Sequence, residues 1–213
     1  MRIRNSDAKT AFLVAASTAA LVSACAMMAP TMESAKIPPQ GSSWSYASTP
    51  SGSFGKENRK TTTTMGMGSW QGKSMMAQHG QPTSIFVNAD GCWVGMAAGS
   101  KPLFGFDPPI CYRFPIAVGN SWSDKRRMTM YQAKKTVNLE SHWKVEAYEE
   151  VSVPAGTFGA FRITYSDDNG TDRVDWFSPE LGIWVKSSIK RRAGHPAGPG
   201  TLENILISHT IPR

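Results

Sequence analysis

Long apolar segments are scarce in this sequence. The N-terminal apolar run, 11–24, is fourteen residues long, whereas a helix needs about 20 to cross a bilayer. After this run, no segment repeats its apolar residues with the 3.6-residue period of an amphipathic helix. These absences argue against a helical membrane protein and a helical bundle, and they indicate a mature domain that is mostly β.

Sequence signatures of catalysis are also missing. The chain has no Gly-x-Ser-x-Gly elbow and no His-Glu-x-x-His motif. Its four histidines are dispersed: His79, His142, His195 and His209. We therefore expect no enzyme activity and no cofactor.

Acidic residues are fewer than basic ones, 16 against 23, which gives a formal net charge of +7. The basic residues are scattered through strand-like segments and form no nucleic-acid motif, so we expect a solvated basic surface and no nucleic-acid partner. A basic surface favours contact with anionic membrane head groups.

Two metal sites are conceivable from the sequence. The pairs Met65/Met67 and Met128/Met130 each place two thioethers on one strand face, which suits Cu(I), but methionine is also a common core residue. The cluster Asp167, Asp168, Asn169 and Asp172 carries oxygen ligands for Ca²⁺. Its order does not match an EF-hand loop, and we interpret it as a solvated hairpin tip, so we predict no metal site.

The N-terminus has the pattern of an export signal. Arg2, Arg4 and Lys9 precede the short apolar run, as in secretory signal peptides. The run ends in Leu21-Val22-Ser23-Ala24-Cys25, which resembles the lipobox of bacterial lipoproteins. The resemblance implies a signal peptide over 1–24, lipidation of Cys25, and an outer-membrane address because residue 26 is alanine. An ordinary signal peptide is the alternative.

Residues 25–40 contain three prolines and no strand pattern, so we predict a disordered tether behind the lipidated cysteine. Cys92 and Cys111 remain in the mature chain, and two cysteines in an exported protein indicate a disulfide, with free thiols as the alternative.

The stretch from Trp143 to Lys186 predicts four antiparallel strands joined by three turns. The turn sequences are Pro154-Ala155-Gly156, Asn169-Gly170 and Pro179-Glu180-Leu181-Gly182. Pairing outward from them places Val145 opposite Tyr165, Ala147 opposite Ile163, Ile163 opposite Trp176, Tyr165 opposite Val174, and Trp176 opposite Val185. One apolar face results, and its candidate ligand-binding residues are Trp143, Phe161, Ile163, Tyr165 and Trp176. This face is either an open groove for an apolar ligand or a closed core.

Two pairs do not fit this pattern. Phe177 pairs with Trp184 on the otherwise polar face, which suggests a second patch that something covers. Asp167 faces Asp172, and like charges directly opposite one another destabilise a sheet.

Gly41-Ser42-Ser43-Trp44-Ser45 recurs as Gly119-Asn120-Ser121-Trp122-Ser123. We predict a single β domain over 41–213. An internal duplication would divide it into halves 41–118 and 119–213, as two similar sheets.

Several motifs of the C-terminal half resemble a signature of uncharacterised exported proteins and lipoproteins of Gram-negative bacteria. They are Phe114-Pro115-x-x-x-Gly119-Asn120-Ser121-Trp122, Val151-x-Val153-Pro154-Ala155-Gly156-Thr157-Phe158 and Trp176-Phe177-Ser178-Pro179-Glu180-Leu181-Gly182. The resemblance implies an antiparallel meander sheet curled into a half-barrel or open barrel, similar to the lipoprotein carriers and receptors of the outer-membrane sorting pathway. It brings no catalytic residue.

Together these observations predict a non-enzymatic lipoprotein that is anchored in the outer membrane on its periplasmic face and binds an apolar or lipid-like ligand. The alternative is a structural or accessory envelope protein that contacts a protein partner through its sheet.

Overall fold

The computed structural model describes residues 29–212, so the expected signal peptide and Cys25 lie outside the described residues. Twelve strands and one short 3₁₀ turn, η1 (Gly52–Phe54), make up the fold. The strands are β1 (Ser43–Pro50), β2 (Arg59–Trp70), β3 (Lys73–His79), β4 (Ser84–Val87), β5 (Trp93–Ala98), β6 (Lys101–Ile110), β7 (Ser121–Met130), β8 (Lys135–Val153), β9 (Gly156–Asp167), β10 (Thr171–Ser178), β11 (Ile183–Arg191) and β12 (Gly200–Thr210). None of the residues from 29 to 212 forms a helix long and apolar enough to cross a membrane.

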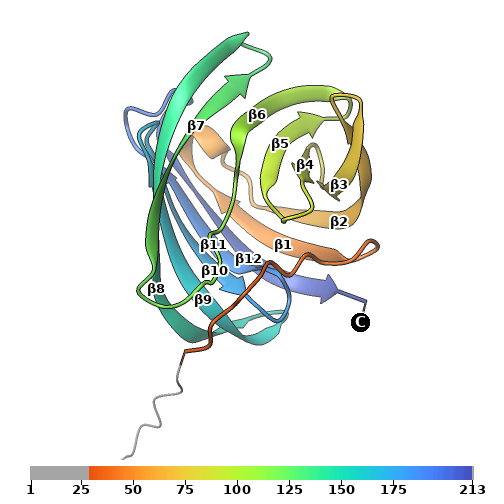
Figure 1. Ribbon diagram of the computed structural model, residues 1–213, viewed down its shortest axis with the longest axis vertical. Helices are drawn as coiled ribbons and strands as arrows, with labels where there is room; N and C mark the ends of the chain where they lie inside the picture. Colours follow the sequence, from red (N-terminus) through yellow and green to blue (C-terminus); the bar gives the residue numbers. More distant parts are fainter. Residues whose placement is uncertain (1–28, 213) are drawn as a thin grey trace, which may run out of the picture.

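Each strand pairs antiparallel with the next, and β1 also pairs with β12, so the sheet is a closed barrel. The predicted mainly-β meander is confirmed, and its curl continues until the two ends meet. Figure 1 shows β2–β6 as a tight curl beside a wide sheet made of β7–β12 and β1. The two parts of the barrel therefore differ in curvature.

The tight curl depends on small residues. A Cβ atom on Gly95 would lie 2.4 Å from the ring of Trp70 and 2.6 Å from the carbonyl oxygen of Phe104. Glycine is required there because only a residue without a side chain allows this approach. The curl closes around Trp70, Ala77, Phe86 and Ala97, all of them buried.

The pairing of β8, β9, β10 and β11 confirms the four-strand meander and corrects its register. Val145 lies opposite Ile163, and Trp143 lies opposite Tyr165. This register is shifted by two residues from the predicted one, which leaves these side chains on the same face. A bulge at Glu146 then places Ala147 opposite Arg162, where Ile163 was predicted.

The turn between β9 and β10 changes the predicted register by one residue. Asp168, Asn169 and Gly170 form a three-residue loop, closed by the Gly170 N–H on the Asp167 carbonyl at 3.2 Å. Gly170 adopts a φ of 93°, whereas Asn169 does not have a positive φ; a two-residue type I′ Asn-Gly turn would need a positive φ at both residues. Ile163 consequently pairs with Asp175 and Tyr165 with Arg173. The predicted partners, Trp176 and Val174, were wrong because the loop has one residue more than predicted. The resulting slip of one residue moves every side chain of β10 to the opposite face.

The connection between β6 and β7 packs across the wide sheet. We call its residues 111–118 the strap. Ile116 in the strap is fully buried and pairs with Met32 through two main-chain hydrogen bonds of 2.8 and 2.9 Å.

The described part of the predicted tether, 29–40, contacts the barrel. Met32 is buried against Ile116, and the Lys36 ammonium donates to the Glu180 carbonyl. A Cβ on Gly182 would lie 2.1 Å from the Lys36 carbonyl oxygen. From Met32 onward the chain is therefore packed against the β10–β11 turn and the strap.

Candidate functional site

Four of the five predicted ligand-binding residues share one face, which we call the inner face. Trp143, Phe161 and Ile163 are buried there in one cluster, and Tyr165 packs against it. Phe161 and Ile163 have no exposed surface. Trp176 lies on the other face, opposite Arg162 and Lys186. The predicted set is therefore divided by the register of β10.

The strap covers the inner face. The Tyr112 ring lies 5.5 Å from the Trp143 ring and 5.3 Å from the Phe177 ring, measured between centroids. Phe114 and Ile116 join the same cluster. Of the two alternatives for the apolar face, the structure has the closed core, because the chain's own strap fills the space.

Phe177 does pair with Trp184, as predicted. A bulge at Val185 then places Trp176 opposite Lys186, and this corrects the predicted Trp176–Val185 pair. Phe177 and Trp184 belong to the same inner cluster as Trp143. Tyr112 covers them, so this pair is not a second patch on the polar face.

A buried polar group adjoins this cluster. The Arg173 Nε lies 2.6 Å from the Asp175 carboxylate, and the two side chains are 14% and 1% exposed. The Tyr112 hydroxyl donates to Asp175 at 3.2 Å and accepts from the Trp184 indole at 2.9 Å. Burial, reinforced by the charge of Asp175, raises the pKa of Tyr112 well above its ordinary value. Tyr112 is thus fixed as a neutral hydrogen-bonding group.

An apolar pocket lies next to this group, with a volume of about 180 Å³. The N-terminal segment 35–38 forms one wall, and β1–β4, the β4–β5 turn, the strap, β10 and β11 contribute the others. Most of its lining is aromatic or aliphatic: Ile37, Trp44, Tyr46, Ile85, Val87, Tyr112, Phe114, Phe177, Ile183 and Trp184. Lys36, Thr63, Gln78 and Asp90 also line it. The pocket can therefore hold an apolar group and offer polar contacts beside it.

A second hollow lies on the outer face of β7–β11, with a volume of about 870 Å³. Its lining follows cross-strand neighbours, among them His142, Ser166, Asp172 and Lys190. One of its bases, Lys144, pairs with Glu146 at 2.8 Å. This groove is open to solvent, and its lining includes charged side chains such as Asp172 and Lys190, so it does not enclose an apolar ligand as the smaller pocket does.

The aspartates of the β9–β10 hairpin do not face one another. Asp167 accepts hydrogen bonds from the Tyr165 hydroxyl at 2.7 Å and the Thr171 N–H at 2.8 Å, whereas Asp172 pairs with Ser166 on the opposite face. The predicted repulsion was wrong because the loop has three residues. Within residues 29–212, no group of three or more His, Cys, Asp or Glu side chains could hold a metal ion.

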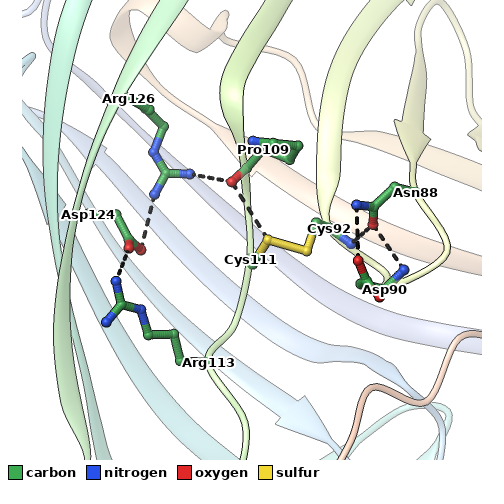
Figure 2. The surroundings of a disulfide bond; sticks show 8 residues. All are labelled: Asn88, Asp90, Cys92, Pro109, Cys111, Arg113, Asp124 and Arg126. Carbon is green, nitrogen blue, oxygen red and sulfur yellow. Dashed lines mark hydrogen bonds and ion pairs between the residues drawn. A yellow bond between two sulfur atoms is a disulfide. The ribbon is translucent and has the colours of Figure 1, made fainter.

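The predicted disulfide between Cys92 and Cys111 is confirmed, with a sequence separation of 19. It joins the start of the strap to the residue before β5. Figure 2 shows the bond next to Pro109, Arg113 and Arg126. The covalent link holds the strap against the tight curl.

Sequence reasoning missed several pocket residues, Trp44, Tyr46, Tyr112 and Phe114 among them. A signal was present: Trp44-Ser45-Tyr46 and Tyr112-Arg113-Phe114-Pro115-Ile116 both alternate apolar residues with a period of two. The prolines around the second segment obscure this pattern.

No family model matches this chain, and no curated protein matches it. Three solved structures resemble it at low identity. The first is a candidate lipoprotein from Parabacteroides distasonis, with 11% identity, a TM-score of 0.43, and coverage of 84% of this chain and 99% of the other. The second is a candidate exported protein with a YmcC-like fold from Bacteroides fragilis, with 12% identity, a TM-score of 0.46, and coverage of 85% of this chain and 99% of the other. The third is the hypothetical lipoprotein YmcC from Escherichia coli, with 11% identity, a TM-score of 0.38, and coverage of 81% of this chain and 90% of the other. At these TM-scores we base neither fold nor function on the resemblance.

Proposed function

We propose that this chain is a lipoprotein of the outer membrane, anchored through Cys25 and facing the periplasm, whose barrel binds an apolar or lipid-like group without catalysing a reaction. The observation that carries the proposal is the apolar pocket. Aromatic side chains line it on several sides, and the segment 35–38 that forms one wall leads back toward the proposed anchor.

The size of the pocket defines the ligand. At about 180 Å³ it is smaller than the roughly 300–1,000 Å³ of pockets for drug-sized molecules. It therefore accommodates one apolar group, such as the end of an acyl chain, and not a whole lipid. Lys36 and Asp90 in the lining provide charged contacts for a polar head outside the pocket.

The rings of His79 and His142 make polar contacts with neutral groups. His79 contacts the Ser84 hydroxyl and the Met67 carbonyl, and His142 contacts the Ser123 hydroxyl. None of these three contacts pairs a histidine with a carboxylate, so they lack the acid–base arrangement that nucleophilic catalysis uses.

A fluorescent fatty acid such as cis-parinaric acid tests the pocket in the full chain. Thr63 lines the pocket from β2, and Thr64 is the next residue on the opposite face of that strand. Thr63→Phe should fill the pocket and reduce binding at least about ten-fold, a loss of about 1.4 kcal/mol, whereas Thr64→Phe should leave binding unchanged. Equal binding by both variants and the parent chain would refute the pocket as the site.

The anchor is tested separately by labelling cells with a radioactive fatty acid. The parent chain should take up the label and fractionate with the outer membrane, and Cys25→Ala should do neither. Label on the Cys25→Ala variant would contradict lipidation at this residue.

A further inference from the structure

The barrel wall has a weak point between β6 and β7. Main-chain pairing there covers only Phe104–Asp107 against Arg127–Met130, although β7 begins at Ser121. Pro108 and Pro109 follow Asp107 directly and have no N–H to donate. As a result, residues 121–126 of β7 pair with β8 on one side, and no strand of the described residues 29–212 pairs with them on the other.

The alternation of an antiparallel ladder identifies the free main-chain groups. The Val145 N–H donates to the Asn120 carbonyl. The main-chain N–H and C=O groups of even-numbered residues in this stretch therefore point toward β8. Ser123 and Lys125 therefore direct their N–H and C=O groups away from β8. In agreement, the Ser123 carbonyl accepts a hydrogen bond from the Arg113 side chain at 3.3 Å.

Side chains bridge the gap where a strand is missing. Figure 2 shows Arg126 reaching the Pro109 carbonyl, at 3.2 Å, while Asp124 lies between Arg126 and Arg113. Arg126 is buried, with 1% of its side chain exposed, whereas Arg113 is 60% exposed. An incoming chain needs to displace the exposed Arg113 from the Ser123 carbonyl, and the same nitrogen of Arg113 also bonds Asp124.

The charges along this edge favour an acidic partner. The ionic side chains at the gap are the four bases Arg113, Lys125, Arg126 and Arg127 against the three acids Asp107, Asp124 and Glu140, the last of which lies 3.3 Å from the Lys125 ammonium. Lys125 is 81% exposed and Arg127 is 65% exposed. A second copy of this chain would bring the same positive edge against itself, and like charges at an interface are unfavourable.

We propose that the edge of β7 over residues 121–126 is a docking site for an extended acidic segment of a partner protein. The segment adds a strand to the barrel and exchanges main-chain hydrogen bonds with Ser123 and Lys125, as in other cases of strand addition to an open sheet edge. Its acidic side chains meet Lys125, Arg127 and the displaced Arg113. This interaction uses a surface separate from the apolar pocket.

The test measures hydrogen exchange of the full chain, with the peptide (Val-Glu)₄ as the probe and (Val-Lys)₄ as its matched control. The acidic peptide should slow exchange of the Ser123 and Lys125 amides at least about ten-fold, and the basic peptide should not. Protection by neither peptide, or equal protection by both, would overturn the proposal.

Two variants separate docking from folding. Lys125→Pro removes an N–H that β8 does not use, so it should abolish protection by (Val-Glu)₄ with little change in melting temperature. Arg113→Glu keeps every main-chain group and should weaken peptide binding several-fold by charge alone. If Arg113→Glu binds the acidic peptide as well as the parent chain does, the proposal fails. Dimerisation of the parent chain that Lys125→Pro abolishes would also overturn it, because the edge would then pair with its own copy.

Discussion

The indole N–H of Trp184 donates a hydrogen bond to the hydroxyl of Tyr112 at 2.9 Å. Trp184 belongs to β11, in the wide sheet, and Tyr112 belongs to the strap. The same hydroxyl donates to the buried carboxylate of Asp175. Tyr112 thus fixes the strap to the inner face and forms part of the pocket wall.

Tyr112→Phe should destabilise the barrel by about 1–3 kcal/mol, because it leaves a buried indole N–H and a buried carboxylate without this partner. Chemical denaturation of the parent chain and the variant measures the difference. Tyr148→Phe is the matched control, since Tyr148 packs on the same cluster and its hydroxyl makes no hydrogen bond within the described residues. Equal stabilities of the two variants would contradict the role given to Tyr112.

Breaking the ion pair of Arg173 and Asp175 should cost more. Arg173→Met leaves the Asp175 carboxylate buried without its charge partner, and such changes cost about 3–5 kcal/mol. Adding Asp175→Asn removes the stranded charge and should recover a large part of the loss. A double-mutant cycle measured by chemical denaturation gives the interaction free energy between the two side chains. If the two substitutions change the free energy of unfolding additively, the two groups do not interact.

Alkaline pH should destabilise the fold through its buried tyrosines. Burial first, and then neighbouring carboxylates, raise the pKa of Tyr46, Tyr112 and Tyr165 above the ordinary value of 10.0. The stability that comes from their neutral forms is complete below about pH 10, the unfolded value, and is lost as the pH rises above it. Absorbance titration should show all five tyrosines ionising near pH 10 in denaturant, and these three remaining neutral there in the native protein. Ionisation of all five near pH 10 without unfolding would contradict their burial.

Gly95→Ala should disturb the tight curl, because the new methyl group would lie 2.4 Å from the Trp70 ring. Overpacking of this kind costs about 1–3 kcal/mol. Gly194→Ala is the control, since its new methyl group has no atom within 4 Å. Thermal denaturation should show a lower melting temperature for Gly95→Ala and an unchanged one for Gly194→Ala.

The meander from β8 to β11 was predictable because turn residues and apolar alternation agree along it. The Phe177–Trp184 pair was found in this way. The side of the sheet on which Trp176 lies could not be predicted in this way, because it depends on whether the loop after Asp167 has two or three residues. Asn-Gly favours two, yet the Asp167 side chain caps the Thr171 N–H and stabilises the longer loop.

The filling of the inner face was beyond sequence reasoning for a different reason. The strap contacts the wide sheet across long sequence separations, as Tyr112 and Trp184 show, which are 72 positions apart in the sequence. Local periodicity does not encode which segment covers a face. The pocket under residues 35–38 depends on the same kind of long-range contact, so it could not be placed from turns and strands alone.

The most direct test of the account is native mass spectrometry of the protein extracted from the outer membrane of its host. We predict that an apolar or lipid-like molecule accompanies the parent chain in addition to the acyl groups on Cys25. It should be absent from Thr63→Phe and present on Thr64→Phe. A parent chain that carries its anchor and no further molecule, or a ligand retained equally by both variants, would contradict the account.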